Sequence, residues 1–199
     1  MLVLTVEEAR RLVAAVDLSH PFGRRDRAML VLAFHTGLRV SELAGLDVAD
    51  VADRNVPRET LFVRAAIGKG GKSRVIPLND IARKAVASLL LFNQARGFSV
   101  DPRAPLLVTR KHTRISVRSI QRIVEELRTR AHLDVPATPH SLRHTFASQV
   151  ARRTGNVRVV QQLIGHVRLE TAQIYVHPDR QELEAAVGQL AKGVTQPCA

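Results

Sequence analysis

The chain has 199 residues, of which 45% are hydrophobic, and its 30 lysines and arginines against 18 acidic residues give a formal net charge of +12. This length suits one compact domain, and the excess of positive charge favours a polyanionic partner, with nucleic acid the leading candidate. Six phenylalanines, one tyrosine and no tryptophan argue against binding single strands by base stacking and favour contact with the phosphates of a duplex.

Cysteine content and apolar stretches narrow the class of protein further. The only cysteine, Cys198, cannot form a disulfide within the chain, and no CxxC pattern is present for zinc. The start, MLVLTVEEARR, brings acids and arginines after a few apolar residues, so we expect no signal peptide. Because the most apolar stretches, 28–34 and 85–92, are too short to span a bilayer, we expect a cytoplasmic protein.

The first part of the chain is predicted to be helical. Thr5 and Glu8 have the spacing of a capping box, with apolar residues at helical intervals behind them. A second helix is expected over about 24–38, with Gly37 near its end as a breaker. A short helical turn should follow over 41–46.

The middle of the chain is predicted to be extended. Residues 60–65 are β-prone, 68–71 are rich in turn residues, and 74–77 form a second short strand. This pattern predicts a hairpin, with a third strand expected near 47–51. Asn79 then begins a long helix.

The remainder is predicted to be helical again. Ser116 can cap one helix, and Thr138 with Pro139 is a strong start signal for another that runs to Gly155. Shorter helices are expected over 157–164 and 169–176, and a last one from Asp179. The predicted fold is mainly α with a small antiparallel β-sheet, an α+β domain without internal repeats.

Tyr175 is the only tyrosine and a potential nucleophile. Its phenol reacts poorly at neutral pH because its ordinary pKa is about 10, so it needs a base or a field of positive charge. A lone tyrosine is more often an amphipathic core residue, so this residue alone does not indicate catalysis.

Two arginines are candidates for binding a phosphate. Arg39 follows the helix-ending Gly37, so its side chain should project from a rigid turn. Arg143 lies three residues after His140, which puts both side chains on one helical face. Two guanidinium forks could hold a pentavalent phosphate and neutralise its charge, although most arginines in so basic a chain contact only DNA backbone or solvent.

The segment GKGGKSR places a lysine between the two predicted strands. An ammonium there could reach a phosphate or donate a proton to a leaving oxygen, and spacing alone does not choose between Lys69 and Lys72. Gly71-Lys72-Ser73 matches the end of a P-loop, but Ala66 stands where the first glycine should be. A strand follows where a P-loop requires a helix. We therefore exclude nucleotide binding here.

Three histidines complete the candidate set. His140 and His144 stand at i and i+4, but Ser141 occupies the place of the glutamate that HExxH zinc chemistry needs. No cysteine or third ligand is available, so no metal site is predicted. His166, beside Gly165 at a helix end, could donate to a phosphate oxygen.

In content and order these segments resemble the catalytic domain of the tyrosine recombinase (phage integrase) family. The matching segments are TGLRVSEL, GKGGKSRVIPL, TPHSLRHTFAS and LIGHVRLETAQIYVH, and the resemblance runs from about Thr5 to the last helix. It implies that six residues fill the family's active-site roles: Arg39, Lys72, His140, Arg143, His166 and Tyr175. It also implies that Glu42 occupies the family's acidic position, supporting an active-site basic residue, and that His144 is structural.

The resemblance further implies a mechanism without metal, ATP or another cofactor. Tyr175 would attack the scissile phosphate of double-stranded DNA, forming a 3′-phosphotyrosyl link and releasing a 5′-hydroxyl. The two arginines and His166 would stabilise the non-bridging oxygens. Lys72 would act as the general acid, and His140 would orient the tyrosine or accept its proton.

Family members usually carry a separate N-terminal DNA-binding domain, which we expect to be absent, so that residues 1–199 form a single catalytic domain. The helix at about 179–192 resembles a segment that docks on a neighbouring protomer, which implies a homo-oligomer, a tetramer on DNA, with a possible recombinase partner or accessory protein. Two alternatives remain open. One is a DNA-binding or regulatory module with a vestigial active site, and the other is a type IB topoisomerase-like relaxing enzyme.

Overall fold

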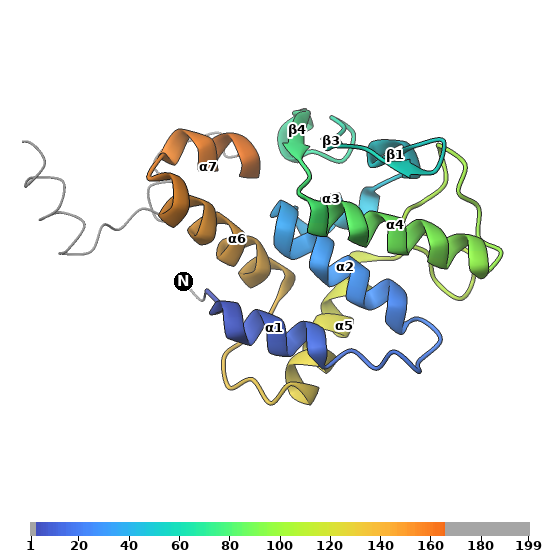
Figure 1. Ribbon diagram of the computed structural model, residues 1–199, viewed down its shortest axis with the longest axis horizontal. Helices are drawn as coiled ribbons and strands as arrows, with labels where there is room; N and C mark the ends of the chain where they lie inside the picture. The colour runs from blue at the N-terminus through green and yellow to red at the C-terminus, as the bar shows by residue number, and fades with distance from the viewer. Residues whose placement is uncertain (1–2, 166–199) are drawn as a thin grey trace, which may run out of the picture.

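The computed structural model describes residues 3–165. The expected helices at 169–176 and from Asp179, together with His166, Tyr175 and Cys198, lie outside the described residues. In chain order the elements are α1 (Val6–Ala14), α2 (Gly23–Thr36), α3 (Val40–Gly45), η1 (Val48–Asp50), β1 (Ala52–Asp53), β2 (Val56–Pro57), β3 (Thr60–Val63), η2 (Lys69–Gly71), β4 (Arg74–Pro77), α4 (Asp80–Ala95), α5 (Val117–Arg130), α6 (Pro139–Thr154) and α7 (Val157–Ile164) (Figure 1). The predicted fold class is confirmed.

The helix boundaries follow the local signals in the sequence. Thr5 Oγ accepts a hydrogen bond from the Glu8 N–H (3.1 Å), and the Glu8 carboxylate accepts one from the Thr5 N–H (2.7 Å), so the predicted capping box is confirmed. Asn79, Ser116 and Thr138 cap their helices as expected, each accepting a backbone N–H three residues on.

The predicted hairpin is confirmed, but the third strand is wrong. β3 and β4 pair antiparallel, with Thr60 opposite Pro77 and Val63 opposite Arg74. Residues 48–50 form a 3₁₀ turn instead of a strand, because the Asp50 carboxylate accepts the Asp47 N–H (2.8 Å). Such local side-chain bonds compete with a β-ladder. β1 and β2 form a separate two-stranded ribbon.

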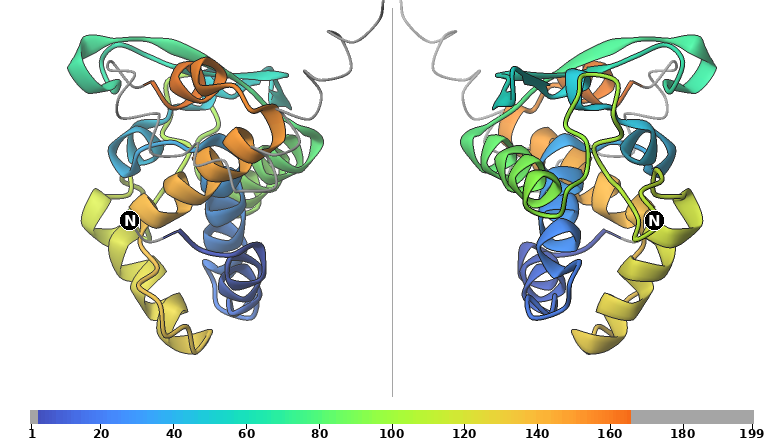
Figure 2. Two further views of the ribbon diagram at one scale, coloured as in Figure 1. Left: turned by 90° about the vertical axis from the view of Figure 1, so that its left-hand side faces the viewer. Right: turned by 90° about the vertical axis from the view of Figure 1, so that its right-hand side faces the viewer.

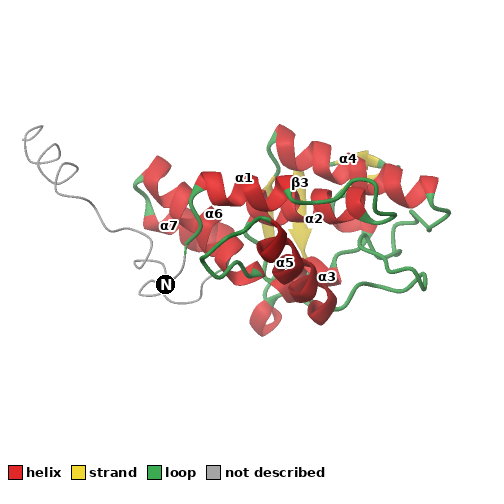
Figure 3. Cartoon of the chain, turned by 90° about the horizontal axis from the view of Figure 1, so that it is seen from below, coloured by secondary structure: helices red, strands yellow, loops and turns green. Residues whose placement is uncertain are grey.

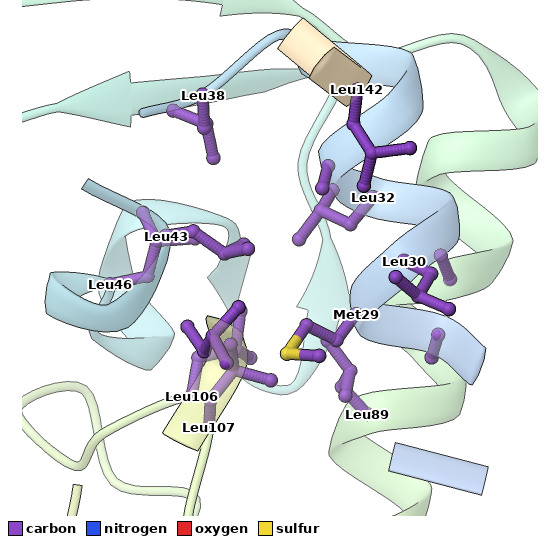
Figure 4. Packing of buried hydrophobic residues seen from close by; sticks show 14 of the residues in the cluster. Met29, Leu30, Leu32, Leu38, Leu43, Leu46, Leu89, Leu106, Leu107 and Leu142 are labelled. Carbon is purple, nitrogen blue, oxygen red and sulfur yellow. The ribbon is translucent and has the colours of Figure 1, made fainter. Parts of the chain in front are cut away.

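Helix α2 lies at the centre of the main hydrophobic core. It packs along α4, and Figure 3 shows α3 and α5 on its opposite side. Met29 and Leu32 project from α2 towards Leu46, Leu106 and Leu107, and all five side chains are 0% exposed (Figure 4). Close packing of these leucines fixes the turn between α2 and α3, from which Arg39 projects.

A second, smaller hydrophobic cluster joins α6 to α7. Its buried members are Ala147 and Ala151 of α6 and Val160 and Ile164 of α7. Helix α7 also packs against strand β4, and Figure 2 shows α7 and the β3–β4 hairpin at one end of the molecule, with α1 and α5 at the other. The end of α7 therefore lies against the strand that follows Lys72.

Candidate active site

Arg39 projects from the turn between α2 and α3, as the sequence predicts. Gly37 ends α2 in the left-handed conformation (φ 60°), and Arg39 is the N-cap of α3. Its backbone N–H and its Nη1 both donate to the Glu42 carboxylate, at 2.8 and 2.9 Å. The side chain keeps 20% of its surface exposed, so the guanidinium is held in place yet open to a ligand.

Glu42 is a fully buried anion between two arginines. Its side chain is 0% exposed. Besides Arg39 it accepts a bidentate pair of hydrogen bonds from Arg74, both of 2.7 Å. Burial raises the pKa of Glu42, but hydrogen bonds and charge from Arg74 and Arg39 outweigh it and hold the pKa below the ordinary glutamate value. The carboxylate therefore stays ionised at neutral pH.

Arg74 is the residue that the sequence interpretation missed. It begins strand β4, two positions after Lys72, and is one of many arginines in a basic chain. The only signal in the sequence is its place at the start of a predicted strand beside the candidate lysine. Its pairing with Glu42, 32 residues away, depends on tertiary structure.

Arg143 is buried within α6. It is 2% exposed, and its Nη1 donates to the Gly37 carbonyl at 2.6 Å. Its Nη2 donates to the Ile164 carbonyl at the end of α7. Arg143 therefore joins the turn that precedes Arg39 to the helix that precedes His166.

Three arginines converge on the C-terminal end of α7. The last carbonyls of a helix lack intrahelical partners and carry partial negative charge, so they attract cations. Each of three consecutive carbonyls accepts a hydrogen bond from a different arginine. The pairs are Leu163 O with Arg74 Nε (3.0 Å), Ile164 O with Arg143 Nη2, and Gly165 O with Arg39 Nη2 (3.1 Å). The helix end and Glu42 thus offset the mutual repulsion of three guanidinium groups and hold them together.

His140 and His144 contact each other through their ring nitrogens. The Nε2 atoms are 2.6 Å apart and the rings meet edge to face, so a single proton lies between them and one ring accepts. Burial, and then the charges of Arg143 and Arg39, lower the pKa of His140. His140 is therefore neutral at neutral pH and able to accept a proton.

The two candidate lysines lie at the tip of the β3–β4 hairpin. Both are exposed, Lys69 in the 3₁₀ turn and Lys72 two residues before the start of β4. A Cβ on Gly68 would lie 2.0 Å from the Lys72 carbonyl oxygen, so only glycine fits there. This close approach explains the glycine before Lys69.

Of the predicted site residues that fall within 3–165, the structure brings Arg39, Glu42, His140, Arg143 and His144 together, and it places Lys72 on the adjacent hairpin. In this part of the chain no group of three or more histidine, cysteine or acidic side chains is arranged to hold a metal ion. No helix over the same residues has the length and apolar character needed to cross a bilayer.

Comparison with known proteins gives consistent matches. The model of the phage integrase family matches residues 3–182. The tyrosine recombinase XerD of Halalkalibacterium halodurans is 34% identical over 174 residues, which are 87% of this chain and 56% of that protein. The chain therefore spans little more than half the length of this curated relative.

Solved structures share the fold. The crystal structure of XerA recombinase matches with a TM-score of 0.75 and 30% identity, covering 100% of this chain and 67% of that one. The site-specific recombinase XerH, crystallised with its difH substrate, matches with a TM-score of 0.74 and 24% identity, covering 93% of this chain and 53% of that one.

Proposed function

This chain belongs to the phage integrase family of tyrosine recombinases, and we propose that it is a site-specific DNA recombinase. The observation that supports this most directly is the convergence of Arg39 and Arg143 on the end of α7, beside the neutral His140. Such an arrangement suits a phosphate in a displacement reaction, because positive charge and a proton acceptor are held ready before the substrate arrives.

The proposed reaction begins with Tyr175. Its phenolic oxygen attacks the scissile phosphorus, the bond to the 5′-oxygen breaks, and a 3′-phosphotyrosyl link replaces it. The phenolic proton passes to His140, and Lys72 gives a proton to the departing 5′-oxygen. A 5′-hydroxyl from another strand then reverses these steps. The energy of the phosphodiester is retained in the phosphotyrosine, so the exchange consumes no ATP.

The remaining residues stabilise charge or hold the reacting groups. Arg39, Arg143 and His166 donate to the non-bridging oxygens as negative charge grows on them. Glu42 holds Arg39 through two hydrogen bonds, and His144 orients the ring of His140 through the Nε2 contact. Removal of one such donor commonly slows the reaction by roughly 10²–10³.

The proposed substrate is double-stranded DNA. The net charge of +12 favours a polyanion, and the comparison structure of XerH holds its difH substrate. Residues 1–199 would act as a catalytic domain in the cytoplasm, assembled as a tetramer on DNA by docking of the segment at about 179–192 on a neighbouring protomer.

Trapping the covalent intermediate tests this proposal. The protein and a Tyr175→Phe variant are incubated with nicked duplexes that carry candidate sites, in the presence of EDTA. We expect a denaturant-resistant protein–DNA adduct from the wild type and none from the variant.

Two results would contradict the proposed function. Binding to DNA at low salt without any adduct would indicate a binding module with a vestigial active site. Relaxation of supercoiled DNA without preference for a site would indicate a topoisomerase-like enzyme.

A further inference from the structure

The carboxylate of Glu42 lies next to the guanidinium that would bind the phosphate. Glu42 Oε1 accepts from Arg39 Nη1 (2.9 Å) and Arg74 Nη1 (2.7 Å). Oε2 accepts from the Arg39 N–H (2.8 Å) and Arg74 Nη2 (2.7 Å). Each oxygen thus accepts two hydrogen bonds, which is the full capacity of a carboxylate. Because the side chain is 0% exposed, water does not screen its charge.

The contact between Arg39 and Glu42 reduces the positive charge that Arg39 can offer to a phosphate. One cation and one buried anion sum to zero, so the pair alone would offer little net attraction to a phosphate. Arg74 adds a second cation, whose side chain is only 10% exposed. The three groups together keep one positive charge, and Arg39 is the most exposed of them, at 20%.

Arg74 also ties together parts of the site that are distant in sequence. Its Nε donates to the Leu163 carbonyl in α7 (3.0 Å). A Cβ on Gly165 would lie 3.1–3.3 Å from atoms of the Arg74 side chain, so the end of α7 rests on it closely. Because Arg74 begins β4, the same side chain links the end of α7 to the hairpin that holds Lys72.

We propose that Arg74 is a positioning residue for strand cleavage, which offsets the charge of Glu42 so that Arg39 presents net positive charge to the scissile phosphate. This inference rests on the proposed function. It predicts that the charge balance around Glu42, and not only the stability of the fold, sets the rate of cleavage.

A charge-rescue experiment separates these two effects. The rate of adduct formation on nicked duplex is measured for wild type, Arg74→Gln, Glu42→Gln/Arg74→Gln and Arg74→Lys, together with DNA affinity and stability in urea. In Arg74→Gln the uncompensated Glu42 neutralises Arg39, so we expect cleavage to fall about 100-fold, with DNA affinity within about threefold because Arg74 acts through Arg39. Adding Glu42→Gln should recover at least about tenfold of that loss, since removing both charges restores the net charge on Arg39.

Arg74→Lys keeps the positive charge but cannot form the bidentate pair of hydrogen bonds with Glu42. It should therefore cleave at a rate between those of Arg74→Gln and the wild type. A matched control is Arg64→Gln. Arg64 directly follows β3, the other strand of the hairpin, and like Arg74 it binds carboxylates, those of Asp47 and Asp50, both at 2.8 Å. Arg64→Gln should loosen the hairpin comparably and leave the cleavage rate within about threefold of the wild type.

Each outcome decides the question. Wild-type cleavage by Arg74→Gln overturns the inference, as does a double variant that recovers less than about tenfold of the loss, or an equal loss in Arg64→Gln. If the buried, unpaired carboxylate prevents Arg74→Gln from folding, the double variant still decides: cleavage above about a tenth of the wild-type rate supports the inference, and slower cleavage overturns it. A wild-type protein that forms no adduct overturns the proposed function itself and is thereby distinguished from a failure of this inference.

Discussion

His140 shows how a single side chain is adapted to the charges around it. The arginines that would hold the phosphate also lower the pKa of His140, after burial, which is the larger cause. Protonation of an imidazole beside Arg143 and Arg39 would add a third positive charge in a partly buried site. Burial, reinforced by the same cations that attract the substrate, therefore keeps the proposed base neutral.

This lowered pKa predicts the acid limb of the pH profile. The folded protein takes up the His140 proton only below the ordinary histidine value of 6.5, so adduct formation should stay near its maximum as pH falls through 6.5 and decline below it. The unfolded chain binds the proton near 6.5, so stability should also decrease as pH falls from 6.5 towards the folded pKa. Adduct rates between pH 5 and 8 and a proton NMR titration, with His140→Gln to assign the resonance, check this. A titration midpoint at or above 6.5 would contradict it.

Gly37 lies in the turn between α2 and α3, two residues before Arg39, and it contacts Arg143. It ends α2 at a φ of 60°, its carbonyl accepts from Arg143, and a Cβ there would lie 2.3 Å from the Phe146 ring. Gly155 offers a matched comparison, since it ends α6 at the same φ of 60° but has nothing within 4 Å of its would-be Cβ.

Alanine at these two glycines should separate backbone strain from steric overlap. Gly155→Ala incurs the left-handed penalty alone, about 1 kcal/mol, and should leave cleavage unchanged. Gly37→Ala adds overlap with Phe146, for a total of about 3 kcal/mol, and shifts the turn that holds Arg39, so adduct formation should slow tenfold or more. Urea denaturation and adduct assays on both variants test this. Equal losses of stability would show that the Phe146 contact relaxes at no cost.

The elements could be predicted from sequence where their signals are local. The capping box at Thr5 and Glu8, the Thr138-Pro139 start and the hairpin strands each depend on neighbouring residues, and each is confirmed. The strand expected near 47–51 is wrong because Asp50 closes a local hydrogen bond that apolar patterning does not reveal.

The candidate active site likewise combines residues that sequence motifs predict with contacts that only the tertiary structure reveals. Arg39, Glu42, His140, Arg143 and His144 could be placed through recognisable motifs, and the structure brings them together. Two features depend on tertiary contacts and have no sequence pattern: the Arg74–Glu42 pair, and the carbonyls of α7 that accept from three arginines.

At the scale of the whole molecule, the site lies where two hydrophobic clusters of unequal size meet. The main core fixes α2, α3 and the hairpin, and hence Arg39 and Arg74. Within residues 3–165, helix α7 is joined to α6 through a cluster of four buried residues, and its Leu163 also packs against the main core. An element with few buried apolar contacts opens locally at a lower free energy than the global unfolding of the protein.

Two valines of equal burial test whether α7 opens on its own. Val86 in α4 belongs to the main core and Val160 in α7 to the small cluster, and both are 0% exposed. Truncation to alanine removes two methyl groups at each, at a cost of about 2 kcal/mol. Val86→Ala should lower hydrogen-exchange protection of the slowest amides throughout the fold.

Val160→Ala should lower protection in α7 while the slow amides of α2 and α4 keep theirs. It should also slow adduct formation more than Val86→Ala, because opening of α7 withdraws the carbonyls of Leu163 and Gly165 from Arg74 and Arg39. Hydrogen exchange followed by mass spectrometry, with adduct assays on both variants, measures these effects. A uniform loss of protection in Val160→Ala would mean that α7 unfolds with the whole domain, and the positions of the arginines would then depend on global stability alone.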